Sequence, residues 1–195
     1  MISTCAKLAD AAPGLACGMA KLISLAVVLA SSLLPTPSSY GQDVGADVPA
    51  LTSAAAAIVA ADTSATLYFY VDLLGLRRVS TFRVDEGFGQ RSGLSDGKPF
   101  DVTVLATGEG ADALQLKIVH FAGAPKADQP GPIQERVGVR YLTFYFSSID
   151  EILERLVSAG VSTLGETPFE LGDGRRFAVV HDPNGVTVEL IGAAE

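Results

Sequence analysis

Glu189, close to the C-terminus, is a carboxylate that could bind a ligand or act as a general base. It lies in a strand-like segment, residues 186–190, in which apolar and polar side chains alternate. The sequence Asp182-Pro183-Asn184-Gly185 before it is typical of a tight turn. Because neighbouring side chains of a strand point to opposite faces, Thr187 and Glu189 lie on the face opposite the apolar residues. Glu189 is therefore either hydrated or directed into a site.

Two earlier segments have the apolar spacing of amphipathic helices. In the first, residues 62–75, Gly75 suits the left-handed conformation that ends many helices. In the second, residues 148–160, Ser148 and Glu151 have the spacing of a capping box, and Gly160 would end the helix. The apolar stripes are Leu67, Tyr70, Leu73 and Leu74 in the first helix, and Ile152, Leu153 and Leu156 in the second.

Strand-like apolar runs surround each helix, so one pattern occurs twice. They follow the first helix at residues 77–84, 100–106 and 113–121, follow the second at 161–166, 176–181 and 186–191, and precede the helices at 54–61 and 137–146. Residues 85–98 contain four glycines, which predicts a mobile loop or a long hairpin connection.

This duplicated order, with the Asp-Pro-Asn-Gly turn before the Glu189 strand, resembles the vicinal oxygen chelate (VOC) superfamily. That superfamily includes glyoxalase I, bleomycin and fosfomycin resistance proteins and extradiol dioxygenases. The resemblance implies an α+β fold of two tandem βαβββ modules, about residues 55–122 and 137–193. The modules are expected to form a curved mixed sheet with a concave cup.

The resemblance also implies four metal-ligand positions in the cup, of which only Glu189 carries a suitable donor. The other three fall on Ala55 (or Ala56), Lys117 and Tyr141. Alanine has no donor atom and lysine is a cation, so no metal or other cofactor is predicted. A divalent metal is the alternative, and it would need a site rebuilt from His120 and His181, which lie at strand ends.

Strand alternation predicts that the cup is lined by Lys117, Tyr141, Thr143, Tyr145 and Glu189. These five residues are the candidate ligand-binding set. Lys117 could supply positive charge beside Glu189, as a metal would in related proteins. Alternatively, Lys117 extends to solvent and Glu189 is hydrated.

The N-terminal part predicts a secretory signal peptide over residues 1–41. An uncharged apolar run, residues 22–34, follows Lys21 and is shorter than the about 20 residues that a membrane span needs. Met19 is a more natural start for such a signal than Met1; a long signal or an uncleaved anchor is the alternative. Residues 42–54 would be a tether and residues 55–195 a periplasmic domain with no stable membrane span after signal removal.

The chain has 14 Lys and Arg against 22 Asp and Glu, and a net charge of −8. An acidic chain without a basic stripe repels phosphate backbones, so nucleic acid is not expected as a partner. Both cysteines, Cys5 and Cys17, precede the predicted cleavage site, so the exported domain would contain no disulfide.

Three functions fit these features. The favoured one is an exported domain that binds a small molecule in its cup without the metal, similar to the bleomycin-binding members. The second is a lyase or isomerase of the glyoxalase class, with Glu189 as base or residual metal ligand and Tyr141 or Tyr145 as acid. The third is a non-catalytic interaction module with a filled cup. Members of the superfamily commonly pair, so the sequence also allows a homodimer.

Overall fold

The computed structural model describes residues 52–110, 113–126 and 130–194. The predicted signal peptide and residues 42–51 of the predicted tether lie outside the described residues. Within the described ranges, no helix is long and apolar enough to cross a membrane.

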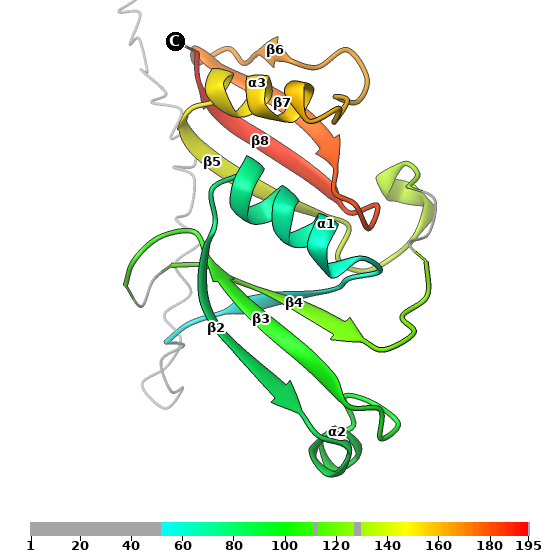
Figure 1. Ribbon diagram of the computed structural model, residues 1–195. Coiled ribbons are helices and arrows are strands. Elements are labelled where there is room, and N and C mark those ends of the chain that lie inside the picture. Colours follow the sequence, from blue (N-terminus) through cyan, green and yellow to red (C-terminus); the bar gives the residue numbers. More distant parts are fainter. Residues whose placement is uncertain (1–51, 111–112, 127–129, 195) are drawn as a thin grey trace, which may run out of the picture. The chain divides into compact units, whose positions relative to one another are not determined.

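The first module has the order βαβββ, with one additional short helix (Figure 1). Its elements are β1 (Ala55–Val59), α1 (Thr63–Leu67), the π-helical η1 (Tyr68–Leu73), β2 (Arg77–Val84), α2 (Glu86–Ser92), β3 (Phe100–Ala106) and β4 (Gln115–Phe121). The strands form a sheet in the order β1-β4-β3-β2, in which β1 and β4 are parallel and the other pairs antiparallel.

The second module repeats this topology. A 3₁₀ turn, η2 (Ile133–Glu135), precedes β5 (Tyr141–Ser148), α3 (Asp150–Ser158), β6 (Phe169–Glu170), β7 (Arg175–His181) and β8 (Thr187–Ala193). The sheet order is β5-β8-β7-β6, again with one parallel pair, β5 and β8. The predicted α+β fold of two tandem βαβββ modules is therefore confirmed, with one four-stranded mixed sheet in each module.

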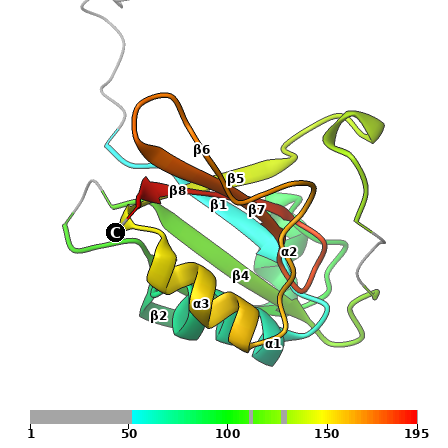
Figure 2. The ribbon, with the colours of Figure 1, turned by 90° about the horizontal axis from the view of Figure 1, so that it is seen from above.

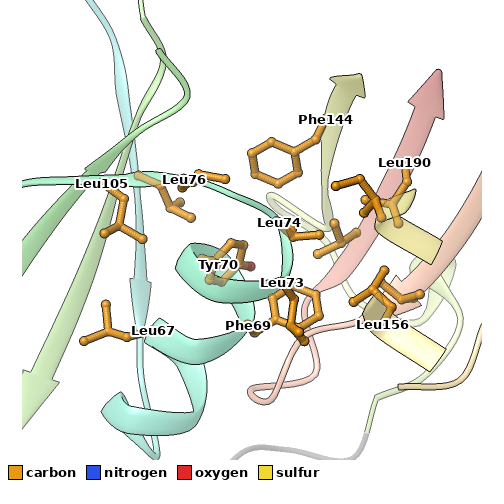
Figure 3. Close-up of a cluster of buried hydrophobic side chains, with 14 of the residues drawn as sticks. Leu67, Phe69, Tyr70, Leu73, Leu74, Leu76, Leu105, Phe144, Leu156 and Leu190 are labelled. Atoms are coloured by element: carbon orange, nitrogen blue, oxygen red, sulfur yellow. The ribbon is translucent and has the colours of Figure 1, made fainter. Parts of the chain in front are cut away.

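The two modules share one hydrophobic core on the helix side of the sheets. Helices α1 and α3 lie on the same side of the strands in both views (Figures 1 and 2). Tyr70 of η1 packs against Phe69, with ring centroids 5.0 Å apart, and against Phe144 of β5 at 6.2 Å. The predicted helical stripes are buried in this core, and Leu156 of α3 and Leu190 of β8 join it (Figure 3). We call the opposite face of the sheets the cup face.

The left-handed helix ends predicted at two glycines are confirmed. Gly75 has φ +82° after η1, and Gly160 has φ +79° after α3. Only glycine adopts this conformation without a steric cost. Strands β2 and β3 begin and end at the predicted residues.

The predicted capping box at the start of α3 is wrong. The residue before the helix is Ile149, and no side chain caps its first turn. Ser148 is instead the last residue of β5, where its hydroxyl oxygen is buried without a partner. Asp150, in the first turn, pairs with Arg176 of β7. Tertiary contacts therefore set this helix start, where the local sequence pattern suggested a cap.

The strand predicted at residues 161–166 is also wrong. Only Thr163 makes a bridge there, to Val180, and the short strand β6 lies further along the chain. The Thr163 hydroxyl donates to the Thr167 carbonyl at 2.8 Å, and the Thr167 hydroxyl donates to the Leu164 carbonyl at 2.7 Å. Such local side-chain bonds favour a turn over an extended ladder.

The glycine-rich segment 85–98 contains a helix, α2, within the predicted connection. The carboxylate of Asp85 accepts a hydrogen bond from the Phe88 backbone N–H at 2.7 Å, which caps the N-terminus. Gly93, with φ +72°, ends the helix. Capping at both ends offsets the low helix propensity of the glycines.

Candidate functional site

Thr143 and Glu189 lie side by side on the cup face of the second module. They are direct neighbours across the parallel pair β5 and β8. The Thr143 hydroxyl donates a hydrogen bond of 2.7 Å to Glu189 Oε2. Both side chains are half-buried. Glu189 is therefore held by a protein donor and is also partly open to solvent.

Two tyrosines flank this pair on the same face of β5. Tyr141 and Tyr145 alternate with the buried Phe144, which points into the helix-side core. Tyr141 is 45% exposed and Tyr145 is 71% exposed. An exposed aromatic ring on each side of a carboxylate offers flat apolar surface next to a polar anchor.

Lys117 lies on the cup face of the first module, in β4. It is the neighbour of Ala57 in β1 and is half-buried. Among the described residues, no ion pair joins Lys117 to Glu189. The structure thus brings Thr143 and Glu189 into contact and places Lys117 on the same face of the other module.

The residues at the expected metal positions do not fit a divalent ion. Ala55 offers no donor, Lys117 is a cation, and one oxygen of Glu189 accepts the Thr143 hydroxyl hydrogen bond. Within the described part of the chain, no group of three or more His, Cys, Asp or Glu is arranged to hold a metal.

The two histidines do not rebuild a metal site. His120 alternates with Lys117 and Val119 in β4, so it points to the helix side, and its Nδ1 is buried without a partner. His181 alternates with the core residue Val180 and so lies on the cup face. Imidazoles on opposite faces of the sheets cannot bind one ion.

The turn before β8 is tied together by a buried carboxylate, Asp182, which is 5% exposed. Asp182 Oδ1 accepts the backbone N–H groups of Asn184 and Val186, both at 2.8 Å. Its Oδ2 accepts the hydroxyl of Tyr70 at 3.0 Å and the side-chain amide of Asn184 at 3.1 Å. Burial, and then the nearby Asp182 carboxylate, raise the pKa of Tyr70 well above its ordinary value.

Asn184 carries this network into the first module. Its Oδ1 accepts the backbone N–H of Ala61 at 2.9 Å, just after β1. Its Nδ2 donates to the Thr66 hydroxyl in α1 at 3.0 Å. The turn therefore fixes β8, and with it Glu189, relative to the β1–α1 connection. The sequence predicted the turn and the buried Tyr70, but it gave no signal that they meet.

A pocket of about 330 Å³ lies where the cup face ends. The end of β1, the segment that joins the modules and the Asp-Pro-Asn-Gly turn form its wall. Lys126, Arg136 and Arg140 are among its lining residues. This pocket was not predicted from the sequence, because the joining segment has no periodic pattern and no motif.

The chain matches the family model of the Glyoxalase/Bleomycin resistance protein/Dioxygenase superfamily over residues 52–190. Among curated proteins, none matches the chain.

Solved structures share the fold at low sequence identity. A glyoxalase family protein from Bacillus cereus is 21% identical, with a TM-score of 0.65 over 77% of this chain and 99% of that protein. A glyoxylase/bleomycin resistance protein/dioxygenase domain from a Frankia species is 18% identical, with a TM-score of 0.51 over 76% and 94%. Glyoxalase I from Zea mays is 18% identical, with a TM-score of 0.53 over 72% of this chain and 44% of that enzyme. The family match, together with the duplicated topology, shows that this chain belongs to the glyoxalase, bleomycin resistance protein and dioxygenase (VOC) superfamily.

Proposed function

We propose that this domain binds a small organic molecule on the cup face of its second module, without a divalent metal. The observation that carries the proposal is the pair of exposed rings, Tyr141 and Tyr145, on either side of the hydrogen-bonded Thr143 and Glu189. Large aromatic side chains that stay exposed beside a polar pair are typical of ligand-binding surfaces.

The residue types support binding that does not depend on a metal. A carboxylate that already accepts one hydrogen bond can accept more from a ligand hydroxyl, amine or amide group. The rings of Tyr141 and Tyr145 can cover an aromatic or aliphatic part of the same molecule. Specificity would come from Glu189, and most of the buried apolar area would come from the tyrosines.

The binding test uses N-phenyl-1-naphthylamine, a neutral aromatic dye whose fluorescence rises in apolar sites. Tyr141→Ala combined with Tyr145→Ala should weaken dye binding about tenfold, because two rings of contact are lost. Tyr68→Ala is the matched control, since Tyr68 is 52% exposed but lies in η1, on the helix side. Equal affinities of the double variant and the control would reject the cup face as the binding surface.

The same site could instead act as a metal-independent lyase or isomerase, with Glu189 as the base. Glu189 is the cup-face carboxylate that the structure brings next to a hydroxyl group, that of Thr143. Glu189→Gln keeps the size and hydrogen-bonding ability of the side chain but cannot accept a proton in the same way. Binding should largely persist in this variant, whereas turnover of a true substrate would be lost.

We also propose that the domain is exported to the periplasm and that it pairs as a homodimer. Export is supported by the apolar run at residues 22–34, which is followed by Pro35, Pro37 and small residues. Pairing is supported by large apolar side chains that remain exposed on the edge strand β2, Val79 and Phe82.

A further inference from the structure

The pocket at the end of the cup face, called the end pocket from here on, has an unusual charge. The described residues that line it include three cationic side chains, one acidic side chain and two exposed valines. These residues are Val59, Lys126, Glu135, Arg136, Val139 and Arg140.

The charge of the end pocket is opposite to that of the whole chain. The chain carries 22 acidic and 14 basic side chains, yet among the described residues of this wall cations outnumber acids three to one. Asp128, in the same joining segment, lies outside the described residues. In a protein of net charge −8, such a local cluster creates a positive region that attracts anions and repels cations.

Arg140 is positioned as the central anion-binding group. It is half-buried directly before β5, and its Nε donates to the Ile133 carbonyl at 3.2 Å. Among the described residues it makes no other hydrogen bond or ion pair, so both terminal guanidinium nitrogens remain available. A guanidinium group that is fixed at one nitrogen can bind a carboxylate, sulfonate or phosphate with the other two.

An apolar path connects the end pocket with the tyrosines of the cup face. Val139, which is 88% exposed, lines the pocket and lies two residues before Tyr141. Tyr141 begins β5 directly after Arg140, so this tyrosine is next along the chain to the residues of the pocket wall. Val59, the last residue of β1, adds apolar surface to the wall.

We propose that the ligand of this domain is an organic acid, with its acidic group in the end pocket and its apolar body against Tyr141. The proposal rests on the small-molecule binding proposed above and adds the chemical class of the ligand. Arg140 binds the acidic group, while Arg136 and Lys126 add positive charge from the joining segment. Glu135, the acidic residue of this wall, reduces the positive charge that the three cationic side chains supply.

Two dyes that differ by one acidic group test this assignment. 8-Anilinonaphthalene-1-sulfonate is N-phenyl-1-naphthylamine with an added sulfonate. We expect the purified full chain to bind the sulfonate at least about fivefold more tightly than the neutral dye at low salt. Raising the salt to 1 M should remove most of this preference, because free ions screen the charges.

Variants that remove positive charges then test which residues cause the preference for the sulfonate dye. Lys126→Gln combined with Arg136→Gln should weaken sulfonate binding about fivefold and leave neutral-dye binding within about twofold. Arg140→Gln should weaken it further, and Arg140→Lys should restore part of the loss because it keeps the charge. Arg78→Gln is the matched control, since this exposed arginine lies in β2, at the opposite edge of the first sheet.

The outcomes separate the two proposals. If the neutral dye binds and the sulfonate binds no more tightly, small-molecule binding stands and the organic-acid assignment is overturned. It is also overturned if Arg78→Gln weakens sulfonate binding as much as the pocket variants do. If neither dye binds to the folded protein, the proposed binding function fails and the assignment fails with it.

Discussion

Removing one hydroxyl group, by Tyr70→Phe, tests whether the buried network holds the two modules together. Tyr70 is fully buried, and its hydroxyl donates to Asp182 at 3.0 Å across 112 residues of sequence. Phenylalanine keeps the ring and its contacts with Phe69 and Phe144, so no large cavity forms. The change in stability therefore reports the hydrogen bond itself.

The expected loss of stability depends on the hydrogen bonds that Asp182 keeps in the variant. Its carboxylate still accepts hydrogen bonds from the backbone of Asn184 and Val186 and from the Asn184 side chain. The charge thus stays paired, and only the net worth of one hydrogen bond to a charged group is lost. We expect the free energy of unfolding to fall by about 1.5–2 kcal/mol. The midpoint of thermal unfolding should fall by about 4–8 °C.

Urea unfolding followed by circular dichroism measures this free energy directly. Tyr68→Phe is the control, because Tyr68 is exposed and its hydroxyl should contribute less than about 0.5 kcal/mol. Equal unfolding free energies for the Tyr70→Phe and Tyr68→Phe variants would refute the argument, since the buried hydrogen bond would then contribute nothing to stability.

The pH dependence of the same variant gives an independent check. The pKa of Tyr70 lies well above its ordinary value of 10.0 in the native protein, because burial and Asp182 disfavour the phenolate. Above pH 10 the unfolded chain releases this proton while the native protein keeps it, so stability falls as pH rises. The fall approaches about 1.4 kcal/mol per pH unit above pH 10 and is negligible below about pH 9. Tyr70→Phe lacks this contribution, so the wild-type advantage should shrink between pH 9 and pH 11.

Two further outcomes follow from the fold and from the N-terminal sequence. Gly192→Ala should destabilise the domain by about 1–3 kcal/mol in urea unfolding, because its Cβ would lie 2.9 Å from the Phe146 carbonyl oxygen. Gly108→Ala meets no atom within 4 Å and should be nearly neutral; equal losses would contradict the packing argument. Native mass spectrometry of the protein exported by its host should give a chain that begins at residue 42, as a metal-free dimer. A precursor mass would reject the signal peptide, a monomer would reject pairing, and a bound divalent ion would reject our interpretation of Ala55 and Lys117.

The fold was largely predictable because both modules carry strong local patterns. Apolar strand-like runs marked the bounds of β2 and β3, and glycines marked the ends of η1 and α3. The start of α3 was mispredicted because the pairing of Asp150 with Arg176, not a local cap, accompanies it. Patterns within one segment do not encode contacts with distant ones.

The candidate site was predictable only in part. Alternation along β5 and β8 correctly placed Tyr141, Thr143 and Glu189 on one face, because the side-chain period of a strand is fixed. The Thr143–Glu189 hydrogen bond depends on strand register, which the sequence did not specify. The end pocket depends on how the joining segment folds back against the turn, and no sequence period describes such a contact.

The Asn184 contacts join groups that are synthesised far apart in time. Ala61, just after the first strand, donates its backbone N–H to an amide that emerges from the ribosome 123 residues later. Similarly, the Tyr70 hydroxyl donates its hydrogen bond to Asp182, which is synthesised 112 residues later. The first module therefore does not contain the acceptors of these two donors, and a chain truncated before residue 182 would lack both hydrogen bonds. Completion of this network consequently requires the chain to be synthesised at least as far as Asn184.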